Sequence, residues 1–219
     1  GRAISTVEKN LIEGALIVIF VLVIFLGNLR AGLIVASAIP LSLLFALGMM
    51  NVFGVSANLM SLGAIDFGLI VDGAVIVVEA TLHHLGLRKS TERLSQEQMD
   101  TEVFESASKI RTSAAFGEII ILIVYIPILT LVGVEGKMFT PMAKTVGFAI
   151  LGALILSLTY IPMMCALFLP KTGHSKKTFS DRFIERLQKI YAPLLQKAIR
   201  IKYLIVALTI GIFAVAVFV

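Results

Sequence analysis

Apolar residues in this chain fall into six long runs, and a polar stretch separates each run from the next. A run of about 20 apolar residues is long enough to cross the hydrocarbon core of a bilayer as a helix. The pattern therefore predicts an all-α protein, a polytopic bundle of about six transmembrane helices. The predicted spans cover residues 11–26, 33–50, 59–82, 114–132, 142–169 and 203–219.

Two polar stretches are long enough to form structure of their own. The first, at about residues 86–111, is predicted to be a cytoplasmic loop within the main bundle of residues 1–170. In the second, residues 171–202, apolar side chains recur at helical spacing between basic ones. This spacing predicts an amphipathic helix that either lies along the inner membrane surface or packs on the bundle as a linker. Residues 203–219 then start a further transmembrane helix.

The composition supports a membrane protein and gives its orientation. Hydrophobic residues make up 58% of the 219 residues and charged residues only 15%, whereas a soluble domain is seldom more than half apolar. Of the 19 Lys and Arg residues, 15 lie in the three stretches that would share one side of the membrane. The positive-inside rule places that side in the cytoplasm and the N-terminus outside. The basic residues thus indicate how the chain is oriented in the lipid membrane, and we expect no nucleic-acid partner.

Several other classes of protein are disfavoured. The chain has no GxxxxGK[ST] loop, so an ATP-driven motor is not expected. Its one cysteine excludes an internal disulfide and any CxxC metal or redox motif. An intramembrane aspartyl protease would need its two aspartates on facing helices, which the pattern does not provide. The chain starts without Met and stops within an apolar run, and we expect it to be a piece of a longer protein.

The stretch DFGLIVDGAVIVVE places three carboxyl groups, Asp66, Asp72 and Glu79, in the middle of an apolar run. A charged carboxylate at the centre of a bilayer costs roughly 2.5–3.5 kcal/mol on insertion scales. Such groups survive by facing a bundle interior or water, or by taking up protons, and both solutions suit proton transport. We therefore predict that the three acids form a proton relay. The alternative is a structural role, in which they bond to neighbouring helices.

Helical geometry refines this prediction. On one continuous helix over residues 59–82, Asp72 and Glu79 share a face, whereas Asp66 points about 120° away from Asp72. Small residues on the same helix would let a neighbouring helix approach closely. These close-packing positions are Gly63, Gly68 and Gly73.

Three further groups of residues could take part in chemistry. Glu118 lies near the inner end of the fourth run, where we expect it to be interfacial and a candidate for proton exit. Met163, Met164 and Cys165 are weak metal candidates, because adjacent residues of a helix point about 100° apart, and core packing is the favoured interpretation. The same reasoning applies to His83 and His84, which we expect at the membrane interface. No resident cofactor and no metal site are predicted.

The stretch LMSLGAIDFGLIVDGAVIVVE resembles the fourth transmembrane helix of heavy-metal efflux pumps of the resistance-nodulation-division superfamily, in the cobalt–zinc–cadmium (CzcA-type) branch. The stretch TVEKNLIEGALIVIFVLVIFLGNLRAGLIVASAIPLSLL resembles the second and third helices of these pumps. The stretch GEIIILIVYIPILTLVGVEGKMFTPMAKTV resembles the fifth helix and the turn into the sixth. The resemblance covers nearly all of the chain and implies helices two to seven of a twelve-helix protomer.

The resemblance implies proton-driven export of a divalent heavy-metal cation (zinc, cobalt, cadmium or nickel) by a secondary transporter that is not an enzyme. Asp66, Asp72 and Glu79 match the acidic relay positions of the family. Their basic partner comes from a helix outside this chain, and without it we expect Asp66 and Asp72 to be mostly protonated at neutral pH. Ala80 departs from the pattern, which has Asn there.

The family also implies a homotrimer in the bacterial inner membrane, joined to a periplasmic adaptor and an outer-membrane channel. Two alternatives remain open. One is a drug-exporting pump of the same superfamily, which the DFG sequence and Glu79 disfavour. The other is a proton-coupled accessory for protein or lipid translocation.

Overall fold

The computed structural model describes residues 2–55, 63, 65–87, 93–171 and 179–218, and all regular structure in these residues is α-helical. The predicted all-α fold is therefore confirmed. The helices are α1 (Arg2–Leu26), α2 (Leu29–Val52), α4 (Phe67–Gly86), α5 (Gln96–Leu129), α6 (Gly133–Leu158), α7 (Tyr160–Phe168), α8 (Phe179–Arg200) and α9 (Lys202–Phe218).

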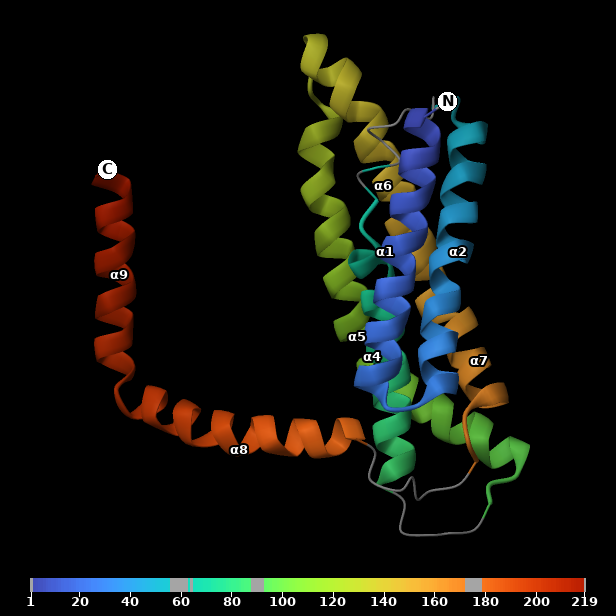
Figure 1. Cartoon of the computed structure of the whole chain (residues 1–219), viewed down its shortest axis with the longest axis vertical. Helices are drawn as coiled ribbons and strands as arrows, with labels where there is room; N and C mark the ends of the chain where they lie inside the picture. The colour runs from blue at the N-terminus through green and yellow to red at the C-terminus, as the bar shows by residue number, and fades with distance from the viewer. Residues whose placement is uncertain (1, 56–62, 64, 88–92, 172–178, 219) are drawn as a thin grey trace. The chain divides into compact units, whose positions relative to one another are not determined.

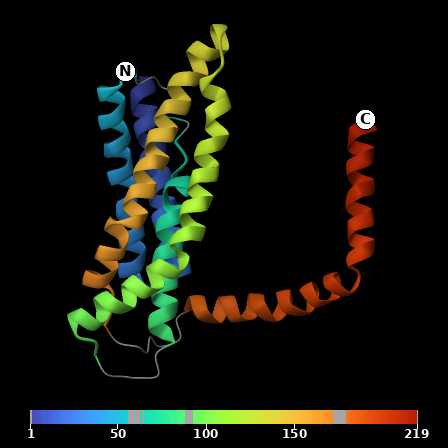
Figure 2. The same ribbon diagram turned by 180° about the vertical axis from the view of Figure 1, so that it is seen from behind.

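The chain divides into two units, residues 1–176 and residues 177–219. In the first unit, helices α1, α2, α4, α5 and α6 run side by side as a bundle, which the opposite views of Figures 1 and 2 both show. Helix α4 contacts every other helix described in this unit. It is therefore the element through which a change at one helix can reach the others.

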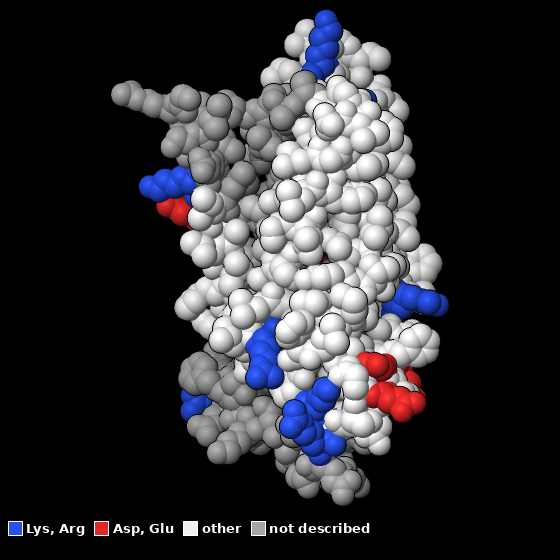
Figure 3. Space-filling view, turned by 90° about the vertical axis from the view of Figure 1, so that its right-hand side faces the viewer, with Lys and Arg blue, Asp and Glu red and all other residues white. Residues whose placement is uncertain are grey.

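The described residues contain four or five candidate membrane-spanning helices, against about six predicted. Among the described residues, four helices are long and apolar enough to cross a bilayer: α2, α4, α5 and α6. The apolar part of α1, Ile12–Leu26, is shorter, and α9 meets the same criterion only when it is taken together with α8. A wide band of the face in Figure 3 carries almost no charged side chain, as expected of a surface in contact with lipid. These features are those of a multi-pass membrane protein.

Helices α1 and α2 form a hairpin whose turn follows from two residues. Gly27 has a φ of 60°, a left-handed conformation that glycine adopts without strain. The side chain of Asn28 then caps α2 by accepting a hydrogen bond from the Arg30 amide at 3.0 Å. Gly32, in the next turn, lies directly against Val23 of α1, so the two helices pack with their backbones close together.

The stretch predicted to be a loop at residues 86–111 is largely helical. Helix α5 begins at Gln96 because Ser95 and Gln98 form a capping box, in which each side chain bonds the other's backbone amide. Met99 and Val103 on its first turns are buried in the bundle core. The loop prediction is therefore wrong from residue 96 onward. The polar first turns of α5 lie at an angle to its apolar part (Figure 2).

The fifth predicted span, residues 142–169, is interrupted. Helix α6 begins earlier, at Gly133, and ends at Leu158, and α7 follows after Thr159. Pro162 accounts for the break, because it has no amide hydrogen to bond the Leu158 carbonyl.

The second unit consists of α8 and α9, whose axes make an angle of 83°. Helix α8 covers the stretch predicted to form an amphipathic helix. The described apolar side chains of α8 and α9 are exposed within the unit. Whether α8 lies on the membrane surface or on the bundle stays a prediction.

The close packing of α1 on α2 is testable through glycine. A methyl group on Gly32 would lie 3.0 Å from the Cα of Val23, and backbone cannot move aside cheaply. We expect Gly32→Ala to lower the free energy of unfolding in detergent by about 1–3 kcal/mol. Gly48→Ala, on the same helix with no described atom within 4 Å of the added group, is the matched control and is expected to be neutral or stabilising by up to about 1 kcal/mol. Equal stability of both variants would contradict this packing.

Candidate functional site

The first acid of the predicted relay does not lie within the helix. Ile65 and Asp66 are non-helical, and α4 begins at Phe67. Asp66 is its N-cap, with an extended backbone and a side-chain oxygen that accepts a hydrogen bond from the Gly68 amide at 2.8 Å. Aspartate is among the best N-cap residues because it satisfies an amide that the first helical turn leaves unpaired. The prediction of one continuous helix carrying all three acids is therefore wrong.

Asp72 and Glu79 lie on one face of α4, as their spacing of seven residues requires. Both side chains are exposed, and Ile76 between them is 40% exposed. The two carboxyl groups are about 10 Å apart along the helix axis. This acidic face, formed by Asp72, Ile76 and Glu79, is uncovered by the described residues, whereas the opposite face of α4 is buried against its neighbours.

Gly73, the residue after Asp72, lies on the buried side of α4 and contacts a fourth acid, Glu118. A methyl group placed on Gly73 would collide with the carboxyl group of Glu118 from α5 and lie 3.1 Å from the Cβ of Ser157 from α6. Three helices therefore meet at Gly73, and only a residue without a side chain leaves room for the carboxyl group. The other two glycines differ: Gly68 meets only the side chain of Asp66, and Gly63 has no described atom within 4 Å of an added Cβ.

Glu118 is 2% exposed, which corrects the expectation that it lies at the interface. The reason is the early start of α5, which puts Glu118 far along the helix and not near its inner end. Neither carboxyl oxygen makes a hydrogen bond of ordinary geometry with the described residues, although the Gly73 backbone and the Ser157 side chain lie beside it. An ionised carboxylate is costly at a buried position with so few polar groups around it.

Asp72 stands between the other acids of this arrangement. It follows Asp66 by six residues and directly precedes Gly73, which Glu118 contacts. Within the described ranges, neither these three acids nor Glu79 forms an ion pair with Lys, Arg or His. Charge on one of the acids therefore disfavours charge on its neighbours.

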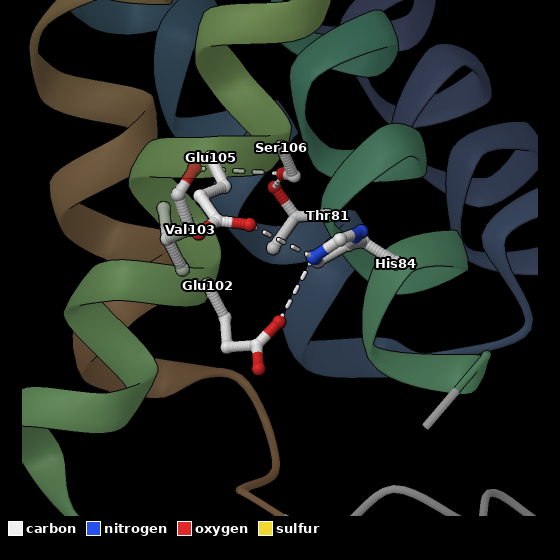
Figure 4. A network of polar contacts seen from close by, with 6 residues as sticks. All are labelled: Thr81, His84, Glu102, Val103, Glu105 and Ser106. Carbon is white, nitrogen blue, oxygen red and sulfur yellow. Dashed lines mark hydrogen bonds and ion pairs between the residues drawn. The ribbon is translucent and has the colours of Figure 1, made fainter. Parts of the chain in front are cut away.

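The structure does not bring the weak metal candidates together. In α7, Met163 is 51% exposed, whereas Cys165 is fully buried in the core, so the two sulfur atoms point in different directions. His84 lies instead beside α5, with its Nε2 atom 2.9 Å from a carboxyl oxygen of Glu102 (Figure 4). No group of three His, Cys, Asp or Glu residues in the described part of the chain could hold a metal ion.

Comparison with known proteins agrees with the arrangement of these helices. The model of the AcrB/AcrD/AcrF family matches residues 1–219. The chain is 48% identical over 201 residues to the cobalt-zinc-cadmium resistance protein CzcA of Cupriavidus metallidurans, covering 90% of this chain and 18% of that protein. It is 45% identical over 198 residues to the nickel-cobalt-cadmium resistance protein NccA of Alcaligenes xylosoxydans xylosoxydans, with the same coverage. The cation efflux system protein CusA of Escherichia coli K12 is 30% identical over 205 residues.

A solved structure, the X-ray crystal structure of a heavy metal efflux pump, superposes with a TM-score of 0.64 at 43% sequence identity. The match covers 75% of this chain and 16% of that one. The chain thus spans about a fifth of the length of the curated relatives it matches. It belongs to the AcrB/AcrD/AcrF family, in the heavy-metal efflux (CzcA-type) branch of the resistance-nodulation-division superfamily.

Proposed function

We propose that the protein to which this chain belongs exports divalent heavy-metal cations in exchange for protons, and that α4 carries the proton-binding groups. The observation that carries the proposal is the arrangement around Asp72. One acidic face of α4 is open, and a buried fourth acid touches the next residue, Gly73. Glu118 is almost fully buried without an ion pair among the described residues, and only the Gly73 backbone and the Ser157 side chain lie beside its carboxyl group.

In this proposal protons from outside bind both Asp66 and Asp72 and neutralise the charge of the cluster. Because Asp72 interacts with both Asp66 and Glu118, each protonation changes the cost of charge at the next group. Helix α4 contacts all the other described helices of its unit, so a change in its packing can be transmitted through the bundle. Glu118 is suited to receive the proton from Asp72 on its way inward.

The substrate class rests on the named relatives. Those at 45–48% identity are named for resistance to cobalt, zinc, cadmium and nickel, so we propose a divalent cation as the exported substrate. We further propose a homotrimer in the bacterial inner membrane that joins a periplasmic adaptor and an outer-membrane channel through parts outside this chain. No observation favours drug export or a protein or lipid translocation accessory.

Replacing the central acid tests the function. We expect Asp72→Asn in the full-length protein to lower metal export into an acidified compartment by about 100-fold or more, because an amide cannot take up the proton. Membrane insertion and thermal stability should stay close to those of the wild type, since Asp72 is exposed and has no ion pair among the described residues. Metal flux in proteoliposomes and metal-dependent growth are the measurements. Undiminished export and resistance would exclude Asp72 from proton coupling.

A pair of substitutions separates the two roles of Asp66. Asparagine caps a helix as well as aspartate does, whereas alanine loses the cap and about 1 kcal/mol of stability. We therefore expect Asp66→Asn to keep the stability of the protein and lose export, and Asp66→Ala to lose both. If Asp66→Asn exports metal at the wild-type rate, Asp66 only caps α4. Thermal unfolding in detergent and metal flux give the two readouts.

A further inference from the structure

Polar groups recur along the contact between α4 and α5, which is otherwise lined by apolar side chains. One such pair is Thr81 and Ser106, whose hydroxyl oxygens are 3.0 Å apart (Figure 4). Both residues are almost fully buried. Thr81 also donates a hydrogen bond to the Val77 carbonyl at 2.8 Å, so its hydroxyl oxygen is free to accept one from Ser106.

One turn further along α4, His84 reaches two carboxyl groups of α5. Its Nε2 atom is 2.9 Å from Glu102 and 4.0 Å from Glu105 (Figure 4). The side chains of His84 and Glu102 are about three-quarters covered, at 26% and 23% exposure. Among the described residues, these two glutamates are the titratable groups that face His84.

Together with Glu118 at Gly73, these contacts place polar groups at three levels of the α4–α5 seam. From Gly73 to Thr81 the rise along α4 is about 12 Å, and from Thr81 to His84 about 4.5 Å. The longer interval contains the buried apolar residues Val77 and Ala114. The seam thus leads from the neighbour of Asp72 toward the inner end of the helix, with one apolar barrier on the way.

We propose that His84 and Glu102 form the inner end of the proton path, and that protons leave Glu118 along the α4–α5 seam and not along the acidic face of α4. This inference rests on the proposed function. It adds His84, which was predicted at the membrane interface, and Glu102, which was predicted in a loop. It also gives the buried hydroxyl groups of Thr81 and Ser106 a role in proton passage.

The transfer requires no redox partner. In the proposed transfer Glu118 loses a proton, water carries it across the apolar interval between Gly73 and Thr81, and the Thr81–Ser106 pair passes it on. Each hydroxyl accepts one proton and donates its own. The His84–Glu102 pair gains the proton and releases it to cytoplasmic water. Histidine is suited to this step because one ring nitrogen can accept a proton while the other donates one.

The neighbouring residue provides a matched control. His83 is exposed and lies on the same side of α4 as Asp72 and Glu79, four residues beyond Glu79. No contact of His83 with another helix is found among the described residues. A path along the acidic face would end at His83, and a path along the seam ends at His84, so two adjacent histidines distinguish the two routes.

The test uses the full-length protein in proteoliposomes, with the inner ends of the helices facing a lumen that contains a pH-sensitive dye. We expect His84→Gln to slow metal-driven proton delivery to the lumen by about tenfold or more, because an amide cannot take up and release a proton. Glutamine still donates a hydrogen bond to Glu102, so the seam should hold. His83→Gln should stay within about twofold of the wild type. Glu102→Gln serves as a second variant if His84→Gln is poorly folded, with the same slowing expected.

Rescue by a soluble base separates proton release from a structural role. Added imidazole should restore proton delivery to His84→Ala and leave His83→Ala unchanged. Slowing of His84→Ala that imidazole does not rescue would show that His84 has a structural role and would overturn the inference. A loss in His83→Gln but not in His84→Gln would overturn it in favour of the acidic face.

If Asp72→Asn abolishes export while both histidine variants behave as wild type, this inference fails and the proposed function stands. If Asp72→Asn exports normally, the proposed function itself fails.

Discussion

The cost of holding a carboxyl group at membrane depth determines most of what is distinctive in this chain. The four acids of the site deal with that cost in three different ways. Asp66 bonds to a backbone amide at the start of α4, and Asp72 and Glu79 lie on its uncovered face. Glu118 is buried with only the Gly73 backbone and the Ser157 side chain beside its carboxyl group. A group in the last situation changes its protonation state when its surroundings change, which is the property that a proton carrier needs.

Gly73 links the two sides of this arrangement. It follows Asp72 in sequence, and its missing side chain leaves the space that Glu118 occupies between α4, α5 and α6. The open acidic face and the buried seam are therefore one residue apart on the same helix. Under the proposed function, protons could move inward from Asp72 by two routes, one past Glu79 and one past Glu118. The polar contacts of Thr81, Ser106, His84 and Glu102 favour the second.

The parts of the fold that the sequence predicts are those set by local spacing. Length and hydropathy predict a helical membrane bundle, and a spacing of seven residues puts Asp72 and Glu79 on one face. The start of α5 was predictable in principle, because Ser95 and Gln98 are a capping-box pair and Met99 and Val103 follow at helical spacing. The polar composition of residues 86–111 nevertheless favoured the prediction of a loop.

Other features depend on contacts between distant parts of the chain. The burial of Glu118 follows from its meeting with Gly73 and Ser157, which no pattern within α5 reveals. His84 and Glu102 likewise lie on two different helices, and the spacing of residues within one helix does not predict their pairing. The break before Phe67 was not predicted, because the apolar residues on both sides of Asp66 indicate a membrane span and conceal its ability to cap a helix.

The central claim is that protons moving inward drive metal outward. It is tested most directly by measuring metal flux through the full-length protein in proteoliposomes while the pH difference is varied at a clamped membrane voltage. The account predicts that the flux rises with the pH difference and that protons move in the opposite direction in a constant ratio. A flux that is the same at every pH difference would contradict it.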